Sequence, residues 1–246
     1  MNFNRPSGFS LLTPVVKNLI IINIVCFLIS SFGEYMRWYD TSNTFGLHYV
    51  LSPSFRPVQF ITYMFLHGNL EHIFFNMLAL WMFGNTLENY WGSKKFLIYY
   101  FATGIGAGIF QMVVAYIRLH SFEITDEMWQ IIVTQGDELL RSGRNWVDGT
   151  LGEINLIVNG PTVGASGAIF GLLMAFGMLF PNAEIYIYFA LPIKAKWFVL
   201  FYGLIELFSG LRNSAGDNTA HFAHLGGMIF GFILIKYWQK HGTNFN

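Results

Sequence analysis

Residues 161–171 read PTVGASGAIFG and begin an apolar run that continues to Phe180. One serine, Ser166, lies between small residues in this run, and no charged residue occurs from Gly160 to Pro181. Small residues let transmembrane helices approach closely, which is one explanation for the pattern. A serine nucleophile needs room for a carbonyl and a base beside it, which is the other explanation. The rest of the sequence decides between packing and chemistry.

The composition is that of a membrane protein. Of the 246 residues, 54% are hydrophobic and only 11% are charged, whereas soluble domains carry about 25% charged residues. So few charges cannot cover a soluble surface, and we predict a polytopic membrane protein. The net charge is zero, which provides no basic surface for nucleic acid. The single cysteine, Cys26, cannot form an internal disulfide and is interpreted as a packing residue.

Six apolar runs, each near the length that crosses the hydrocarbon core, predict the fold. The runs cover residues 15–32, a segment that starts between 58 and 70 and ends near 88, 96–117, 162–180, 197–211 and 219–238. We therefore predict an all-α polytopic membrane protein, built as a bundle of six transmembrane helices. The domain would cover residues 15–240, after a flexible lead at 1–14 and before a C-terminal tail at 241–246.

The basic residues and the polar segment at 118–160 predict the topology. Part of this segment is expected to form a short amphipathic helix, because Ile124, Met128, Ile131 and Ile132 recur at helical spacing. With the N-terminus in the cytoplasm, short cytoplasmic segments hold eight of the fourteen basic residues, as the positive-inside rule requires. These are Arg5, Lys17, Lys94, Lys95, Lys194, Lys196, Lys236 and Lys240. We expect a multi-pass protein of the cell membrane with cytoplasmic termini and the insertion on the outer side.

Four polar residues are expected at similar depth near the outer face, where the second, fourth and sixth helices begin. Ser166 lies four residues into the fourth run, and His224 lies about five residues into the sixth. His72 and Asn76 lie near the start of the second and share one helix face, because they are four residues apart. Four residues of helix correspond to roughly 6 Å of depth. Polar groups inside a membrane are costly and suggest function, so these four residues form the candidate site.

Ser166 and His224 are a candidate nucleophile and base, because a neutral imidazole within hydrogen-bond reach can take the proton of a serine hydroxyl. Attack on a peptide carbonyl creates an oxyanion that needs hydrogen-bond donors. The candidate donors are the backbone N–H of Ser166, the amide of Asn76 and a ring N–H of His72. The sequence places no acid to orient His224, so a dyad is predicted. Glu206, in the fifth run, is expected to make a structural hydrogen bond or to line a wet gate.

Three motifs in this order resemble the rhomboid family of intramembrane serine proteases. They are GASG at residues 164–167, AHLGG at residues 223–227 and the spacing His67-x4-His72-x3-Asn76. The resemblance covers residues 15–240 and implies the six-helix rhomboid bundle. It implies that Ser166 is the nucleophile and His224 the base. It also implies that His72, Asn76 and backbone amides stabilise the oxyanion.

The resemblance implies serine-type endopeptidase activity on other membrane proteins. The expected substrates are single-span membrane proteins, cleaved in their transmembrane segments near the outer face, often after a small residue. The lipid bilayer is the other expected partner. No metal ion, organic cofactor or nucleic acid is implied.

Two positions depart from the family pattern. Many members carry a Trp-Arg pair at the end of the first loop, where this chain has Val58-Gln59, and the anchoring of that loop is left open. An aromatic residue four positions after the serine, often Tyr, commonly packs on the catalytic His. Here it is Phe170, which keeps the ring and lacks the hydroxyl.

Two alternative functions are kept. A membrane metal-site protein could use a cluster of four histidines, although no His-Glu-x-x-His motif is present on a helix. These histidines are His67, His72, His221 and His224. A catalytically inactive rhomboid-like binding module would keep the helices and lose the Ser or the His, both of which are present. His67 and His221 are expected at the membrane interface rather than in the catalytic site.

Overall fold

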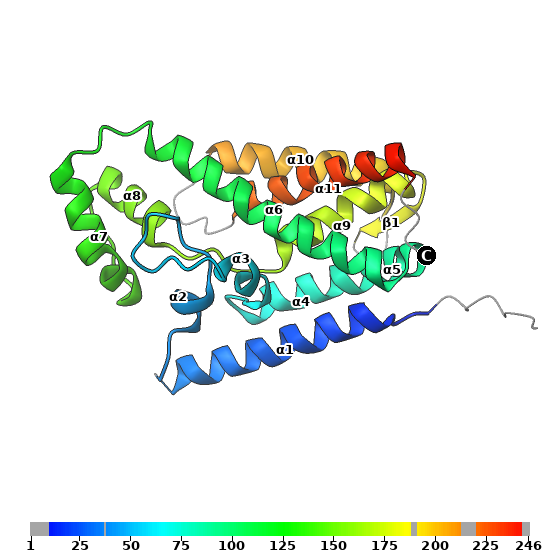
Figure 1. The fold of residues 1–246 in the computed structure, drawn as a ribbon, viewed down its shortest axis with the longest axis horizontal. Helices are drawn as coiled ribbons and strands as arrows, with labels where there is room; N and C mark the ends of the chain where they lie inside the picture. The colour runs from blue at the N-terminus through cyan, green and yellow to red at the C-terminus, as the bar shows by residue number, and fades with distance from the viewer. Residues whose placement is uncertain (1–9, 37, 188–190, 213–219, 243–246) are drawn as a thin grey trace, which may run out of the picture.

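The computed structural model describes residues 10–36, 38–187, 191–212 and 220–242, and most of them are helical (Figure 1). The longer helices are α1 (Pro14–Tyr35), α4 (Leu70–Ala79), α6 (Ser93–Leu119), α9 (Ser166–Leu179), α10 (Ala195–Arg212) and α11 (His221–His241). The π-helical η2 (Leu80–Gly84) and α5 (Asn85–Trp91) continue α4, and α2 (Thr41–Phe45), α3 (Gln59–Thr62) and η1 (Tyr63–Phe65) precede it. Each of the six predicted apolar runs therefore contains helix.

The predicted count of six membrane spans is not confirmed. By length and composition, two of the described helices, α1 and α6, are long and apolar enough to cross a membrane. The apolar α9 has 14 residues, and the second run is divided among α4, η2 and α5. The mostly helical architecture is confirmed, whereas the number of spans stays a prediction.

A small strand pair departs from the all-α prediction. Strand β1 (Glu184–Ile187) pairs antiparallel with β2 (Leu191–Lys194), and Ile185 lies opposite Ile193. Each strand has only four residues, the shortest run over which alternation is read, so the pattern is too brief to separate the strands from a loop. The hairpin connects α9 to α10 and therefore leaves the helical layers unchanged.

Helices α6, α9 and α11 form the centre of the bundle, where glycines bring their backbones together. A Cβ atom on Gly227 of α11 would lie 1.9 Å from the carbonyl oxygen of Gly167 on α9. A Cβ atom on Gly171 of α9 would lie 2.5 Å from the Cβ of Thr103 on α6. Side chains do not fit at these contacts, so the glycines around the serine serve packing as well as any chemistry.

A buried carboxylate attaches the start of α1 to α5. Glu88 is 3% exposed and accepts hydrogen bonds from the N–H groups of Val15 and Val16 at 3.1 and 3.0 Å. A carboxylate at this position satisfies free N–H groups and interacts favourably with the helix dipole. Ser10 and Thr13, in the predicted lead, also bond to α5 side chains. The rest of the lead, residues 1–9, lies outside the described residues.

The start of α1 and the end of α11 lie at the same end of the bundle (Figure 1). Trp238 near the end of α11 contacts Trp91 at the end of α5, with ring centroids 5.6 Å apart, and Glu88 of α5 holds the start of α1. This arrangement suits termini that face one side of a membrane. Which side they face stays a prediction, and residues 243–246 of the expected tail lie outside the described residues.

The insertion at 118–160 forms two helices rather than the single one expected. They are α7 (Asp126–Arg141) and α8 (Gly149–Asn159), which lie together at one end of the molecule (Figure 1). The pattern around Ile132 correctly predicts α7. Helix α8 was not predicted, because its buried face carries Asn155 and Asn159, which donate to backbone carbonyls of α7. Amides on a buried face break the apolar periodicity that the prediction depends on.

One buried amide anchors the first loop, which the sequence left open. Gln59 is fully buried, and its Nε2 donates to the carbonyl oxygens of Thr44 and Ser54 at 3.1 and 2.9 Å. Its Oε1 accepts from the backbone N–H groups of His48 and Arg56. A single side chain therefore fixes separate parts of the loop before the helix that follows.

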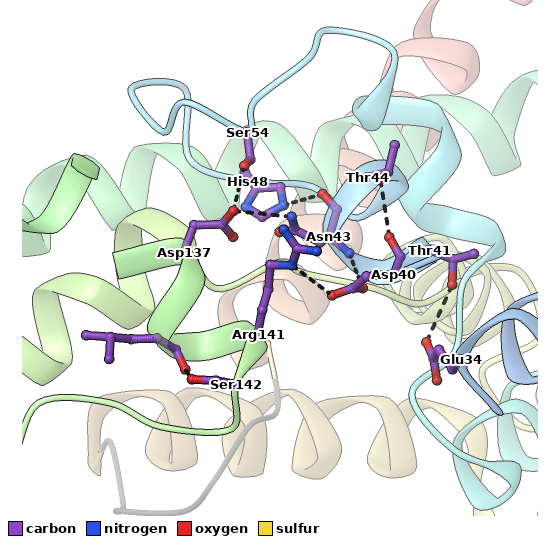
Figure 2. Close-up of polar contacts among 11 residues, drawn as sticks. Glu34, Asp40, Thr41, Asn43, Thr44, His48, Ser54, Asp137, Arg141 and Ser142 are labelled. Carbon is purple, nitrogen blue, oxygen red and sulfur yellow. Dashed lines mark hydrogen bonds and ion pairs between the residues drawn. The ribbon is translucent and has the colours of Figure 1, made fainter. Parts of the chain in front are cut away.

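The first loop also contacts the insertion (Figure 2). Asp137 of α7 accepts from Asn43 and Ser54, each at 3.4 Å, and Arg141 lies 3.8 Å from Asp40. A cavity of about 750 Å³ lies beside these contacts, and its lining includes no residue of the candidate site. The loop and insertion therefore form one polar assembly at the end of the bundle where α6 ends.

We expect Gly227→Ala to destabilise the fold, because its Cβ would meet the backbone of Gly167. Overpacking of this kind costs about 1–3 kcal/mol, which lowers Tm by several degrees in a chain of this size. Thermal unfolding in detergent measures the change. The control is Gly149→Ala, because a Cβ there meets no atom within 4 Å. Equal Tm values for the two variants would contradict this account of the helix contact.

Candidate functional site

Ser166 is the first residue of α9 and not the fifth, so the expectation that it lies four residues into a helix is wrong. The chain enters α9 through Gly164, whose φ of +130° is a conformation that L side chains rarely adopt. The Gly164 N–H donates to the carbonyl of Tyr63 at 2.9 Å. This turn starts the helix later than the apolar pattern suggests and places the Ser166 hydroxyl at its N-terminal end.

His224 is the fourth residue of α11, and its Nε2 lies 2.8 Å from Ser166 Oγ. The ring of Phe170, one turn after the serine, stacks on the imidazole with centroids 4.2 Å apart and an interplanar angle of 6°. The expected packing of Phe170 on His224 is therefore confirmed. The sequence also correctly predicts that these two helices bring Ser166 and His224 together.

Glu206 of α10 approaches the opposite side of the imidazole. Its Oε2 lies 2.9 Å from Nδ1 of His224 and 2.7 Å from Nδ1 of His221. The sequence did not place an acid beside His224, and the structure has one at hydrogen-bond distance; the hydrogen bond expected of Glu206 is therefore present. The signal in the sequence is a lone acid in an apolar run. Spacing alone could not show that this acid faces α11.

His72 lies beside the serine, near the start of α4. A Cβ on Gly164 would lie 2.9 Å from His72 Nε2 and 3.4 Å from Ser166 Oγ, so the ring and the hydroxyl border the same space. The N–H of Gly68 donates to Nδ1 of His72 at 3.4 Å. In the neutral ring, Nε2 therefore carries the proton and directs it towards this space.

Asn76 lies one turn after His72 and is buried. Its Nδ2 donates to the backbone carbonyl of His72 at 2.8 Å. An amide NH₂ has two donors, and this bond occupies one of them. The structure thus places Asn76 on the same helix face as His72, as the spacing predicts, and fixes the plane of its amide.

The four histidines form two pairs rather than one cluster. The rings of His67 and His72 meet edge to face at 5.0 Å, whereas His221 and His224 share Glu206. His67 is 6% exposed, so it packs inside the protein, and its depth relative to the membrane surface stays a prediction. Among the described residues, the group with a donor set suited to a metal ion is Glu206, His221 and His224, whose ligand atoms lie within 4.8 Å of one another.

Comparisons with known proteins agree with this architecture. The family model described as "Rhomboid domain" matches residues 54–240. The chain is 28% identical over 231 residues to rhomboid protein 1, mitochondrial, of Saccharomyces cerevisiae, covering 92% of this chain and 54% of that protein. It is 31% identical over 173 residues to rhomboid protease AarA of Providencia stuartii, covering 70% and 52%.

A third relative is rhomboid protease GluP of Bacillus subtilis, which is 28% identical over 173 residues, covering 70% of this chain and 24% of that protein. The chain spans about half the length of most curated relatives it matches. The family model covers more than half of the chain, from the first loop to the end of α11. The protein therefore belongs to the rhomboid family of membrane-integral proteins.

Proposed function

We propose that this protein is an intramembrane serine endopeptidase in which Ser166 is the nucleophile and His224 the general base. The observation that carries the proposal is the 2.8 Å separation of Ser166 Oγ and His224 Nε2, joined across two helices. A hydroxyl at this distance can pass its proton to the imidazole as it attacks. Protease-named members of the same family support this class of reaction.

The reaction follows from this pair. Ser166 Oγ bonds to the carbonyl carbon of the scissile peptide while its proton moves to His224 Nε2, which gives a tetrahedral oxyanion. The intermediate collapses as the C–N bond breaks, and His224 returns the proton to the leaving amine. Water then attacks the acyl carbon while His224 takes its proton; the bond from that carbon to Ser166 Oγ breaks, His224 returns the proton to Oγ, and the carboxylic acid product leaves.

We propose three donors for the oxyanion that forms in the space next to Ser166. The N–H of Ser166 belongs to the first turn of α9, where helix N–H groups have no partner within the helix. Nε2–H of His72 is directed at this space, and Asn76 has a second amide N–H beyond the one bound to its own helix. Donors fixed before the reaction stabilise developing charge without reorganisation.

The substrates we propose are single-span membrane proteins, cut in their transmembrane segments. Ser166, His72 and His224 all lie within the first four residues of their helices. The site is therefore close to the membrane face at which α4, α9 and α11 begin, opposite the end where α1 starts. Some relatives are named mitochondrial, so the cell membrane is not part of this proposal.

We expect Ser166→Ala and His224→Ala each to abolish cleavage of a single-span test substrate by the purified protein in detergent. A serine-reactive fluorophosphonate should label the wild type and leave Ser166→Ala unlabelled. Ser30→Ala and His120→Ala are matched controls, because Ser30 is buried in α1 and His120 is exposed. Turnover by either site variant, or labelling that survives Ser166→Ala, rejects the proposed function.

We expect His72→Ala and Asn76→Ala each to lower kcat by about 100-fold, as the loss of one oxyanion donor does, with KM nearly unchanged. Steady-state kinetics at equal amounts of folded protein measure the effect. Asn23→Ala is the matched control, because Asn23 Nδ2 also donates to the carbonyl four residues earlier, at 2.8 Å. A variant with wild-type kcat would remove that residue from the oxyanion site.

A further inference from the structure

We propose that Glu206 is a positioning residue that holds His224 in the tautomer and orientation needed to take the Ser166 proton, so that the site works as a Ser-His-Glu triad. This inference rests on the proposed protease function and adds a third group to its dyad. The three side chains come from α9, α11 and α10, and they meet in one line of hydrogen bonds at 2.8 and 2.9 Å.

The carboxylate determines which imidazole nitrogen carries the proton. An ionised carboxylate can only accept hydrogen bonds, so His224 Nδ1, at 2.9 Å from Glu206 Oε2, is the protonated nitrogen. In the neutral ring, the lone pair then lies on Nε2, which faces Ser166 Oγ. A base needs its lone pair at that position. Glu206 therefore favours the productive tautomer of His224 over the other one.

The same contact stabilises the charge that appears during the reaction. When His224 takes the serine proton, it becomes an imidazolium beside a carboxylate that is 5% exposed. Opposite charges interact more strongly in such surroundings than in water, and a lone buried cation would be costly. This interaction is made in the transition state and not with bound substrate, so its loss should lower kcat rather than raise KM.

His221 fixes the carboxylate itself. It lies one turn before His224 on α11, and its Nδ1 is 2.7 Å from the same Oε2 atom. Two donors from one helix therefore hold a single oxygen of Glu206. Phe170 stacks on a face of the His224 ring, with centroids 4.2 Å apart, and Tyr202 of α10 packs on Phe170 at 5.0 Å. The hydrogen bond to Glu206 thus fixes the rotation of the imidazole within its plane, and the stacked Phe170, held by Tyr202, fixes the tilt of that plane.

The short separations favour shared protons over a shared metal ion. Zinc binds nitrogen and oxygen ligands at about 2.0–2.2 Å in a tetrahedron, which separates the ligand atoms by about 3.3–3.6 Å. Glu206 Oε2 lies at 2.7 and 2.9 Å from the two imidazole nitrogens, and these are hydrogen-bond distances. The group is therefore described better as a carboxylate accepting two N–H bonds than as a cation site.

The test compares Glu206→Ala, Glu206→Gln and Glu206→Asp with the wild type in detergent. We expect Glu206→Ala to lower kcat and the rate of fluorophosphonate labelling by about 100-fold, the lower range of effects for acid-base groups, with KM nearly unchanged. Glu206→Gln keeps a hydrogen-bond acceptor but loses the charge, so its kcat should fall less than that of Glu206→Ala. Glu206→Asp should recover part of the kcat, because it restores a carboxylate.

Glu88→Gln is the matched control for losing a buried carboxylate. Glu88 is 3% exposed and holds the start of α1 by hydrogen bonds. Replacing this carboxylate by an amide in Glu88→Gln should therefore lower Tm while leaving the kcat of the folded protein unchanged. If Glu206 only held helices together, its variants would follow this control, and their effect would disappear once kcat is expressed per folded molecule.

A spectroscopic measurement determines the His224 tautomer independently of enzyme activity. In Ser166→Ala protein labelled with ¹⁵N at histidine, the His224 signal, assigned by its loss in His224→Asn, should report protonated Nδ1. Adding Glu206→Ala should shift the population towards protonated Nε2. The same tautomer with and without Glu206 would overturn the inference.

The outcomes separate this inference from the proposed function. Wild-type kcat in Glu206→Ala, with Ser166→Ala inactive, would reject the positioning role and leave the protease assignment intact. Labelling that survives Ser166→Ala would reject the protease assignment, whatever the Glu206 variants do. Loss of wild-type activity on adding a chelator, restored by zinc, would replace the proton network with a metal site and so overturn the inference.

Discussion

The contact between the backbones of α9 and α11 is the constraint on which the rest of the site depends. Gly167 and Gly227 meet so closely that no Cβ fits between them. Ser166 directly precedes one of these glycines, and His224 lies one turn before the other. Hydrogen bonds need donor–acceptor distances of no more than about 3.2 Å, so helices held apart by larger side chains would lose the bond between Ser166 and His224. Packing and chemistry are therefore two consequences of the same glycines.

Local pattern was enough to predict the part of the site whose position follows from one helix, because the four-residue spacing from His72 to Asn76 places both on one face, as the structure has them. The packing of Phe170 on His224 was implied by the family resemblance, and it is also present. Glu206 could not be placed in this way, because its partners depend on how α10 is rotated against α11. The start of α9 was misplaced because a backbone turn at Gly164 overrides the apolar pattern.

The two sides of the site differ in how their polar groups are satisfied. On one side, the carboxylate of Glu206 accepts from two imidazoles, and His224 uses both of its ring nitrogens within the protein. On the other side, the half-buried His72 ring borders the space beside Gly164 and the Ser166 hydroxyl, and its Nδ1 accepts from Gly68. We infer that this second side receives the substrate oxygen, whereas the first side holds the geometry of His224.

The position of α10 follows from the same argument. Most of its side chains are exposed, as in a lipid-facing helix, and those buried are Ala195, Val199 and Glu206. A hydrogen bond to an ionised carboxylate contributes about 1.5–3 kcal/mol, and Glu206 accepts two of them from α11, which is at least as much as burying Val199 contributes. The Glu206 contacts therefore hold α10 against α11 as well as orienting His224. Helix α10 cannot move away from α11 near Glu206 without releasing the imidazole, so the packing of this peripheral helix and the reactivity of Ser166 are coupled through one carboxylate.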